Sequence, residues 1–213
     1  RAQRFFSRAV EDAWVDLDPE LRGEQTGDGA AVVLVGNGTR IDVRRRPADT
    51  DVAIAIRFLG GGAGDPPALH GRSALLAELS ATGCGSRGAA ALREHLAALH
   101  ATVAPLVDAE SHGVVVRGPR EHVHTLIDLG VSCGLSPSFE RADLVEARLS
   151  AIARVDPIEE AAAAALAEGT PGLVAPRGTV GTIQSVSLGA LERERTASRV
   201  GARTSVAIVG NVD

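Results

Sequence analysis

The hydrophobic period of this chain changes several times, and that succession constrains the fold more than any single motif. Six segments alternate apolar and polar positions and are rich in β-branched residues, which is typical of half-buried strands. They are AVVLV (31–35), RIDVRRR (40–46), DVAIAIRF (51–58), ATVAPLVD (101–108), HGVVVRG (112–118) and RTSVAIVG (203–210). Pro105 has no backbone N–H and cannot donate a hydrogen bond to a neighbouring strand, so we expect its strand at a sheet edge.

Between these strands, apolar residues recur at three- and four-residue spacing, which predicts helices. The predicted helices cover 71–83, 86–100, 121–132 and 139–155, with two more starting at Asp156 and Ser187. Ser86 and Ser187 stand where N-cap residues are expected. We therefore predict an α+β fold in which helices cover a mixed, largely antiparallel sheet, in the order β-β-β-α-α-β-β-α-α-α-β.

The first 29 residues differ in character from the rest. RAQRFFSRAVEDAW places Phe6, Val10 and Trp14 at four-residue spacing, which predicts an amphipathic helix. An acidic, glycine-containing segment follows it. We assign 1–29 to an N-terminal helix and linker and 30–213 to one domain. Two roles stay open for the helix, which either packs on its own domain or docks on a partner.

The charge balance argues against a nucleic-acid partner, and the lengths of the apolar runs argue against a membrane span. The net charge of −5 gives no basic face for nucleic acid, and RRR at 44–46 is interpreted as a solvated strand end. No apolar run approaches the ~20 residues that span a bilayer. A soluble, cytoplasmic protein is favoured, while the Arg1 start and the lack of Met also allow a targeting segment that was removed.

The two cysteines, Cys84 and Cys133, stand in no metal-ligand spacing. They could pair, but in a chain of this size we expect buried, reduced thiols.

The pentapeptide ALREH (91–95) is one residue short of the inverted zinc-peptidase motif H-x-x-E-H. That motif needs two histidines four apart on one helical face, but no histidine precedes His95 by four residues. Glu94 and His95 are adjacent and point in different directions, and His100 is a poor face match. We interpret the pair as solvated.

A second group of histidines also lacks a metal-site pattern. His112 starts a predicted strand, whereas His122 and His124 are two apart on a helix and face differently. The acids near them are Glu110 and Glu121.

A longer series of landmarks, in register over 36–213, resembles the pitrilysin/insulinase-like zinc peptidases and the related mitochondrial processing peptidases. GNGTRIDVRRRP is similar to the family's opening strand pair, and RFLGGGAGDPPALHGRSALLAEL to its glycine loop, acidic-Pro pair and metal helix. Further similar segments are SRGAAALREHLAALHATVAP, GVVVRG with the helices up to Asp156-Pro157, and GTVGTIQ…VAIVGNVD. The resemblance implies one half of a two-domain peptidase clamshell.

That register identifies the positions of the family's metal motif. H-x-x-E-H falls on ALLAE, so the two histidines are replaced by Ala74 and Glu78 and the general-base Glu by Ala77. The family's third ligand, a Glu on the long helix, falls near Leu149, with Glu146 the nearest acid. The resemblance thus implies no catalytic residue and no metal in this chain.

The resemblance implies a catalytically silent half, which shapes a peptide-binding chamber with an active partner that carries zinc. That partner is a second half-domain or subunit of the same family, in a homo- or hetero-oligomer. Substrate peptides would add to the predicted edge strand at Ala101, Thr102, Val103 and Ala104.

Two other functions stay open. The alternative is a structural scaffold of the same fold with no peptidase role, as in core subunits of a respiratory complex. A third hypothesis is a zinc hydrolase that uses Glu94, His95 and His100.

Overall fold

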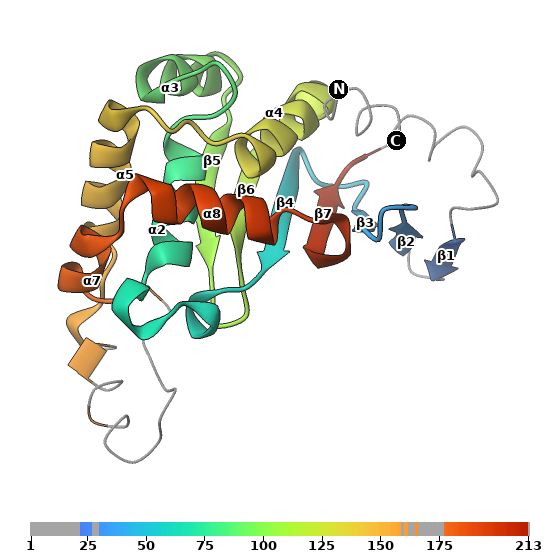
Figure 1. Cartoon of the computed structure of the whole chain (residues 1–213). Coiled ribbons are helices and arrows are strands. Elements are labelled where there is room, and N and C mark those ends of the chain that lie inside the picture. Colours follow the sequence, from blue (N-terminus) through green and yellow to red (C-terminus); the bar gives the residue numbers. More distant parts are fainter. Residues whose placement is uncertain (1–21, 27–29, 159, 162–164, 166–176, 213) are drawn as a thin grey trace.

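The computed structural model describes residues 22–26, 30–158, 160–161, 165 and 177–212. Seven strands form one sheet in the order β1-β2-β3-β7-β4-β6-β5 (Figure 1). The strands are β1 (Arg22–Thr26), β2 (Ala30–Leu34), β3 (Arg40–Arg45), β4 (Asp51–Leu59), β5 (Thr102–Val107), β6 (Ser111–Pro119) and β7 (Thr204–Gly210). β7 inserts between β3 and β4, parallel to β3; the other pairings of the sheet are antiparallel. The predicted α+β fold with a mixed sheet is confirmed.

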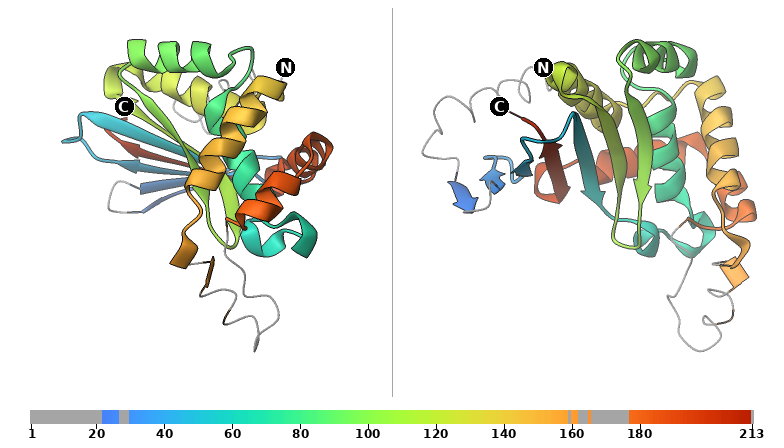
Figure 2. Two further views of the ribbon diagram at one scale, coloured as in Figure 1. Left: turned by 90° about the vertical axis from the view of Figure 1, so that its left-hand side faces the viewer. Right: turned by 180° about the vertical axis from the view of Figure 1, so that it is seen from behind.

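The helices gather on one face of this sheet, as the two views in Figure 2 show. They are α2 (Arg72–Thr82), α3 (Ala89–Ala98), α4 (Val123–Leu135), α5 (Arg141–Ala153), α7 (Val180–Ser185) and α8 (Leu188–Ser198). Strand β4 shows the cause, because its residues alternate between the two faces. Val52, Ile54, Ile56 and Phe58 are buried under the helices.

A second apolar cluster lies farther from the sheet and joins α2 to α5, α7 and α8. Leu75, Leu76 and Leu79 of α2 pack there with Ile183 of α7 and Leu191 of α8. Since α2 also contacts β5 and β6 of the sheet, it is enclosed on several sides. Eight of its eleven residues are buried.

Several local expectations differ from the structure. Residues 22–26, expected in a linker, form β1, and α7 is a helix that the sequence pattern did not predict. Ser187 caps α8 as predicted, since its side chain accepts a hydrogen bond from Ala190 N. Ser86 does not cap α3: the helix starts at Ala89, whose N–H donates to Asp143 Oδ1 of α5 at 3.1 Å. The helix predicted over the first 14 residues, and most of the one predicted from Asp156, lie outside the described residues.

The expectation of reduced cysteines is wrong. Cys84 and Cys133 form a disulfide with their Cα atoms 4.6 Å apart. Cys84 lies just after α2 and Cys133 in the last turns of α4, and both are fully buried in the core cluster under the sheet. The fold brings together two residues that are 49 positions apart, which their spacing alone does not reveal.

Along the described part of the chain, no helix combines the length and the apolar composition needed to cross a membrane.

Candidate functional site

Helix α2 is held at its start by a buried carboxylate in the preceding loop. Asp65, from the Asp-Pro-Pro sequence, accepts hydrogen bonds from Ser73 N at 3.0 Å and from Ser73 Oγ at 2.8 Å, and pairs with Arg72 at 3.3 Å. Burial raises the pKa of the Asp65 carboxyl, although the bonds from Ser73 act in the opposite direction. The loop therefore fixes where the motif positions on α2 lie.

The three motif positions are all enclosed by protein. Ala74, Ala77 and Glu78 expose 2%, 0% and 2% of their surfaces. Two of these side chains are methyl groups, which offer no metal ligand and no base. Glu78 is the one polar group that α2 contributes at these positions.

The Glu78 carboxylate is bound by side chains from α5 and from the segment that follows it. Ser150 Oγ donates to Glu78 Oε2 at 2.9 Å, and Arg154 Nε lies 2.8 Å from Oε1 as an ion pair. The contact between Arg154 and Glu78 does not have the geometry of a hydrogen bond, and Glu78 Oε1 accepts no hydrogen bond from the described residues. Arg177 Nη1 is 4.0 Å from Oε1. Burial raises the pKa of the Glu78 carboxyl, opposed first by the Ser150 hydrogen bond and then by Arg154 and Arg177.

A pocket of about 170 Å³ opens beside this network. Its lining comes from α2, α3, β5 and α5 together with Arg154 just beyond α5: Glu78, Ala81, Thr82, Leu92, Arg93, Val103, Pro105, Glu146, Ser150 and Arg154. Glu146, the nearest acid to the family's third-ligand position, forms an ion pair with Arg93 of α3. Leu149 is 65% exposed. We call this pocket, with the outer edge of β5, the α2–β5 groove.

The donor set of the groove does not fit zinc. A zinc site with catalytic function needs three protein ligands and an open position. Here Glu78 and Glu146 are each paired with an arginine, and the other two motif positions carry no donor atom. Across the residues that the structure describes, no group of three or more His, Cys, Asp or Glu side chains could hold a metal ion.

Strand β5 lies at the edge of the sheet, as Pro105 predicted. Asp108 N donates to Ser111 O in the β5–β6 turn at 2.9 Å, which makes these two residues a hydrogen-bonded pair. Hydrogen-bonded and non-bonded pairs alternate along an antiparallel ladder. Val103, Pro105 and Val107 therefore direct their backbone groups to the outer edge. Two N–H donors are available there, and the third is missing at Pro105.

The predicted peptide-binding residues Ala101 to Ala104 fall at the start of this strand. Ala101 is buried before β5, Thr102 is exposed, and Val103 and Ala104 are half-buried. Only Val103 of the four lines the pocket.

The remaining sequence candidates are not brought together. Glu94 is exposed and His95 half-buried on α3, while His100 follows the helix with a positive φ of 49°. His122 and His124 lie at the start of α4.

His112 is buried apart from the other histidines, and its Nδ1 lies 2.9 Å from Gly60 O. Burial lowers the pKa of His112 to about 4, so its ring is neutral at pH 7.

Ser150 and Arg154, the two nearest partners of Glu78, were not predicted from the sequence. They lie 72 and 76 positions after Glu78, and neither forms part of a known motif. One indication was available: a glutamate amid the apolar residues of a helix expected to be buried needs a partner.

Comparisons with known proteins bear on the fold. No protein-family model and no curated protein matches the sequence. Among solved structures, the chain is similar to the crystal structure of pitrilysin, with a TM-score of 0.76 at 14% sequence identity. The chain folds as one pitrilysin-like domain. The match covers 91% of this chain and 23% of the pitrilysin chain, so a pitrilysin-like domain of this size spans about a quarter of that protein.

Proposed function

We propose that this chain is a non-catalytic half or subunit of a pitrilysin/insulinase-type zinc metallopeptidase, and that it shapes the peptide-binding chamber together with an active partner. The observation that carries the proposal is the Glu78–Ser150–Arg154 network on an intact motif helix. In this pitrilysin-like fold, α2, α5 and the edge strand β5 surround one groove. Only the donor atoms that the chemistry needs are missing.

The network also supports a silent role through its energetics. A buried carboxylate is costly unless it is paired and hydrogen-bonded. Glu78 has both kinds of partner, which tie α2 to α5. A cation from the protein thus balances the charge at a position where the family has a ligand of its metal. The zinc and the general base of the proposed peptidase then come from the partner.

The α2–β5 groove offers limited binding to a peptide. An added strand would find the outward backbone groups of Val103 and Val107, and one of its residues could enter the pocket beside Arg93 and Arg154. The missing donor at Pro105 shortens the ladder. We therefore propose that this half contributes a short contact with the peptide and that the partner supplies the remainder.

Native mass spectrometry of the untagged protein from its own source tests the pairing. We expect a heteromer with one zinc, which stays with the second chain after dissociation. Zinc retained by this chain alone would contradict the proposal.

Peptide cleavage by that heteromer tests the chamber. Thr82→Trp puts a large side chain into the pocket at the end of α2 and so hinders binding of the peptide. KM should therefore rise while kcat stays the same. Thr196→Trp, on the exposed face of α8, is the matched control and should change neither. Equal KM values for the two variants would argue against a peptide contact in this groove.

The alternative is a structural scaffold of the same fold, and Pro105 is the observation that favours it. An edge strand that lacks a donor is protected from added strands. A metal-free homomer, or a metal-free assembly with unrelated proteins, would support this second function.

A further inference from the structure

The face of the sheet opposite the helices has no cover from the described residues. Between Arg117 and Arg57, and beside Arg40 and Asp42 of β3, it carries a patch of small apolar side chains. Strand register places Ala53 and Ala55 of β4, Ala104 of β5, Val115 of β6, and Ala207 and Val209 of β7 on it. We call these six residues the bare face. The right-hand view of Figure 2 shows the strands in front and the helices beyond them.

The side chains of the bare face are small and half-buried. They leave a shallow surface, and Leu59, which is 53% exposed, lies farther along β4 on the same face. An apolar surface that continues across several strands favours a cover with large apolar side chains.

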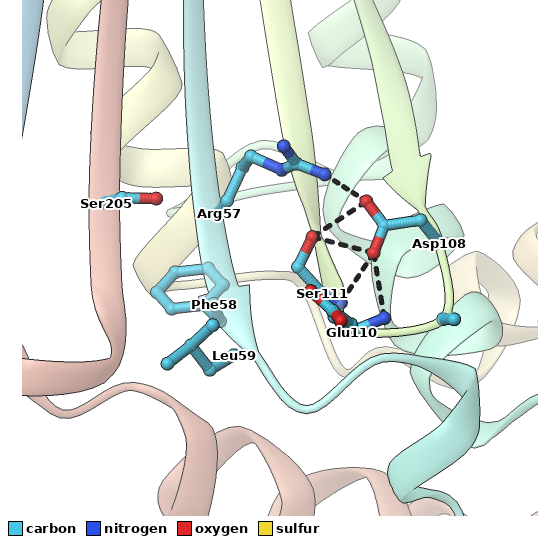
Figure 3. A pocket seen from close by; sticks show the side chains of 8 residues that line it. Arg57, Phe58, Leu59, Asp108, Glu110, Ser111 and Ser205 are labelled. Carbon is cyan, nitrogen blue, oxygen red and sulfur yellow. Dashed lines mark hydrogen bonds and ion pairs between the residues drawn. The ribbon is translucent and has the colours of Figure 1, made fainter.

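A hollow of about 430 Å³ lies at one end of this face (Figure 3). Arg57 and Leu59 of β4, Ser205 of β7 and the β5–β6 turn line it. Arg57 pairs with Asp108, which also accepts hydrogen bonds from the turn residues Glu110 and Ser111. The polar groups at the hollow are thus held in place, and Leu59 adds an apolar wall.

The sequence before β1 has the complementary properties. On a helix, Phe5, Phe6, Val10 and Trp14 would form an apolar stripe, and they include three of the five aromatic residues of the protein. A helix over residues 1–14 would be about 21 Å long, which is about the width of four strands. Large aromatic side chains on such a helix fit a sheet surface made of alanine and valine.

The position of β1 makes the reach possible. Arg22, the first residue of β1, belongs to the same row of paired residues as Leu34, Arg40, Ser205 and Arg57. Four strand spacings separate it from Arg57, or about 19 Å. The eight residues from Trp14 to Arg22 extend up to about 27 Å. Trp14 can therefore reach the hollow.

We propose that residues 1–15 dock on the bare face of their own domain as an amphipathic helix, with Trp14 at the hollow beside Leu59 and Arg57. The segment then supplies the second layer that the other face of the sheet receives from its helices. This inference goes beyond the proposed peptidase role and does not depend on it.

Trp14 is the only tryptophan, so its fluorescence reports the docking directly. In the full chain we expect a blue-shifted emission maximum and a low acrylamide quenching constant. Ala55→Glu, at the centre of the bare face, should shift the emission to the red and raise the quenching constant. Ala97→Glu, on the exposed side of α3, is the matched control and should leave both unchanged.

A second variant separates docking from folding. Phe6→Glu combined with Val10→Glu changes only the segment, so the melting of the domain can be followed independently by circular dichroism. We expect the same red shift of Trp14 as in Ala55→Glu. The proposal would be overturned if Trp14 is exposed to solvent in the unmodified chain. It would also be overturned if Trp14 is protected but its emission and quenching stay the same in these variants.

Sedimentation at the same concentrations identifies the occupant. A monomer with a protected Trp14 supports docking within one chain. Protection that appears only in a dimer, or only after a second protein is added, overturns it in favour of a second copy or a partner on this face.

Discussion

Helices α2 and α3 follow each other in the chain and carry two versions of the same motif. ALREH on α3 comes within one residue of H-x-x-E-H, whereas ALLAE on α2 keeps none of its histidines. Yet α2 is enclosed by the sheet and three helices, while only Ala89, Leu92 and Leu96 of α3 are buried. The two helices therefore differ in burial, although α3 carries the closer match to the motif in sequence.

The contrast has an energetic side that can be measured. Most side chains of α2 are packed closely against neighbouring elements, so a substitution there disturbs the packing of the core. Most positions on α3 face water, where substitutions usually alter stability by less than about 0.5 kcal/mol. Four changes, ordered from large to small effect, test this difference.

The largest effect is expected for Ala77→Glu, which puts a glutamate at the position that the resemblance assigns to the family's general base. Ala77 is fully buried, so an added carboxylate would be taken out of water and would disturb the packing around α2. We expect a loss of about 4 kcal/mol or more in the free energy of unfolding. Denaturant unfolding measures it, with Ala91→Glu on the exposed side of α3 as control. A loss as small as that of the control would show that α2 is not enclosed.

The disulfide that follows α2 comes next. The bridge closes a loop of about 50 residues, for which chain entropy predicts about 4 kcal/mol of stabilisation. Cys84→Ala with Cys133→Ala should lose most of it, and reductant should then have no further effect. Thiol titration of the denatured, unreduced wild type should find no free thiol; two would contradict the pairing.

Arg154→Ala should cost about 2 kcal/mol at neutral pH, because it removes the closer of the two arginines that pair with the buried Glu78 carboxylate. The raised pKa of Glu78 sets the sign of the pH dependence. Ionised Glu78 lowers stability above its folded pKa, and protonation relieves this cost as pH falls through that pKa. The loss of Arg154 raises the pKa of Glu78 further, so the difference between variant and wild type should shrink in acid.

Unfolding of both proteins at neutral and acidic pH checks this. His112 destabilises both equally as pH falls from about 6.5 towards 4. Glu94→Ala on α3 is the control. A difference that grows in acid would contradict the assigned charge of Glu78.

The smallest effect on stability is expected for Ala91→His, which completes H-x-x-E-H on α3. Ala91 is exposed, so the free energy of unfolding should change by less than about 0.5 kcal/mol. The introduced imidazole would share a face with His95, and the two would chelate zinc. Titration calorimetry measures this binding, with the double variant that also carries His95→Ala as control. Without a third ligand, no peptidase activity should appear.

The sequence predicted those parts of the fold that depend on local pattern. The alternation in DVAIAIRF gave β4, Ser187 gave the start of α8, and Pro105 gave the edge strand. The misses depend on distant contacts. β1 is stabilised by pairing with β2, and the cap of α3 comes from Asp143.

The candidate site divides in the same way. Register with the family located Ala74, Ala77 and Glu78 on the helix after the Asp-Pro-Pro loop. The partners of Glu78 come from α5 and the residue after it, where a serine and an arginine match no pattern. Only the folded chain shows that they bind Glu78.

The place of β7 in the sheet has a consequence for how the protein is made. β7 separates β1–β3 from β4–β6, although it is the last of the described strands to be synthesised. While the ribosome is still adding residues before Thr204, the strands of the sheet exist as two unjoined groups with open edges. Such edges are prone to wrong pairing. The two groups can therefore join into one sheet only after Thr204–Gly210 has been synthesised.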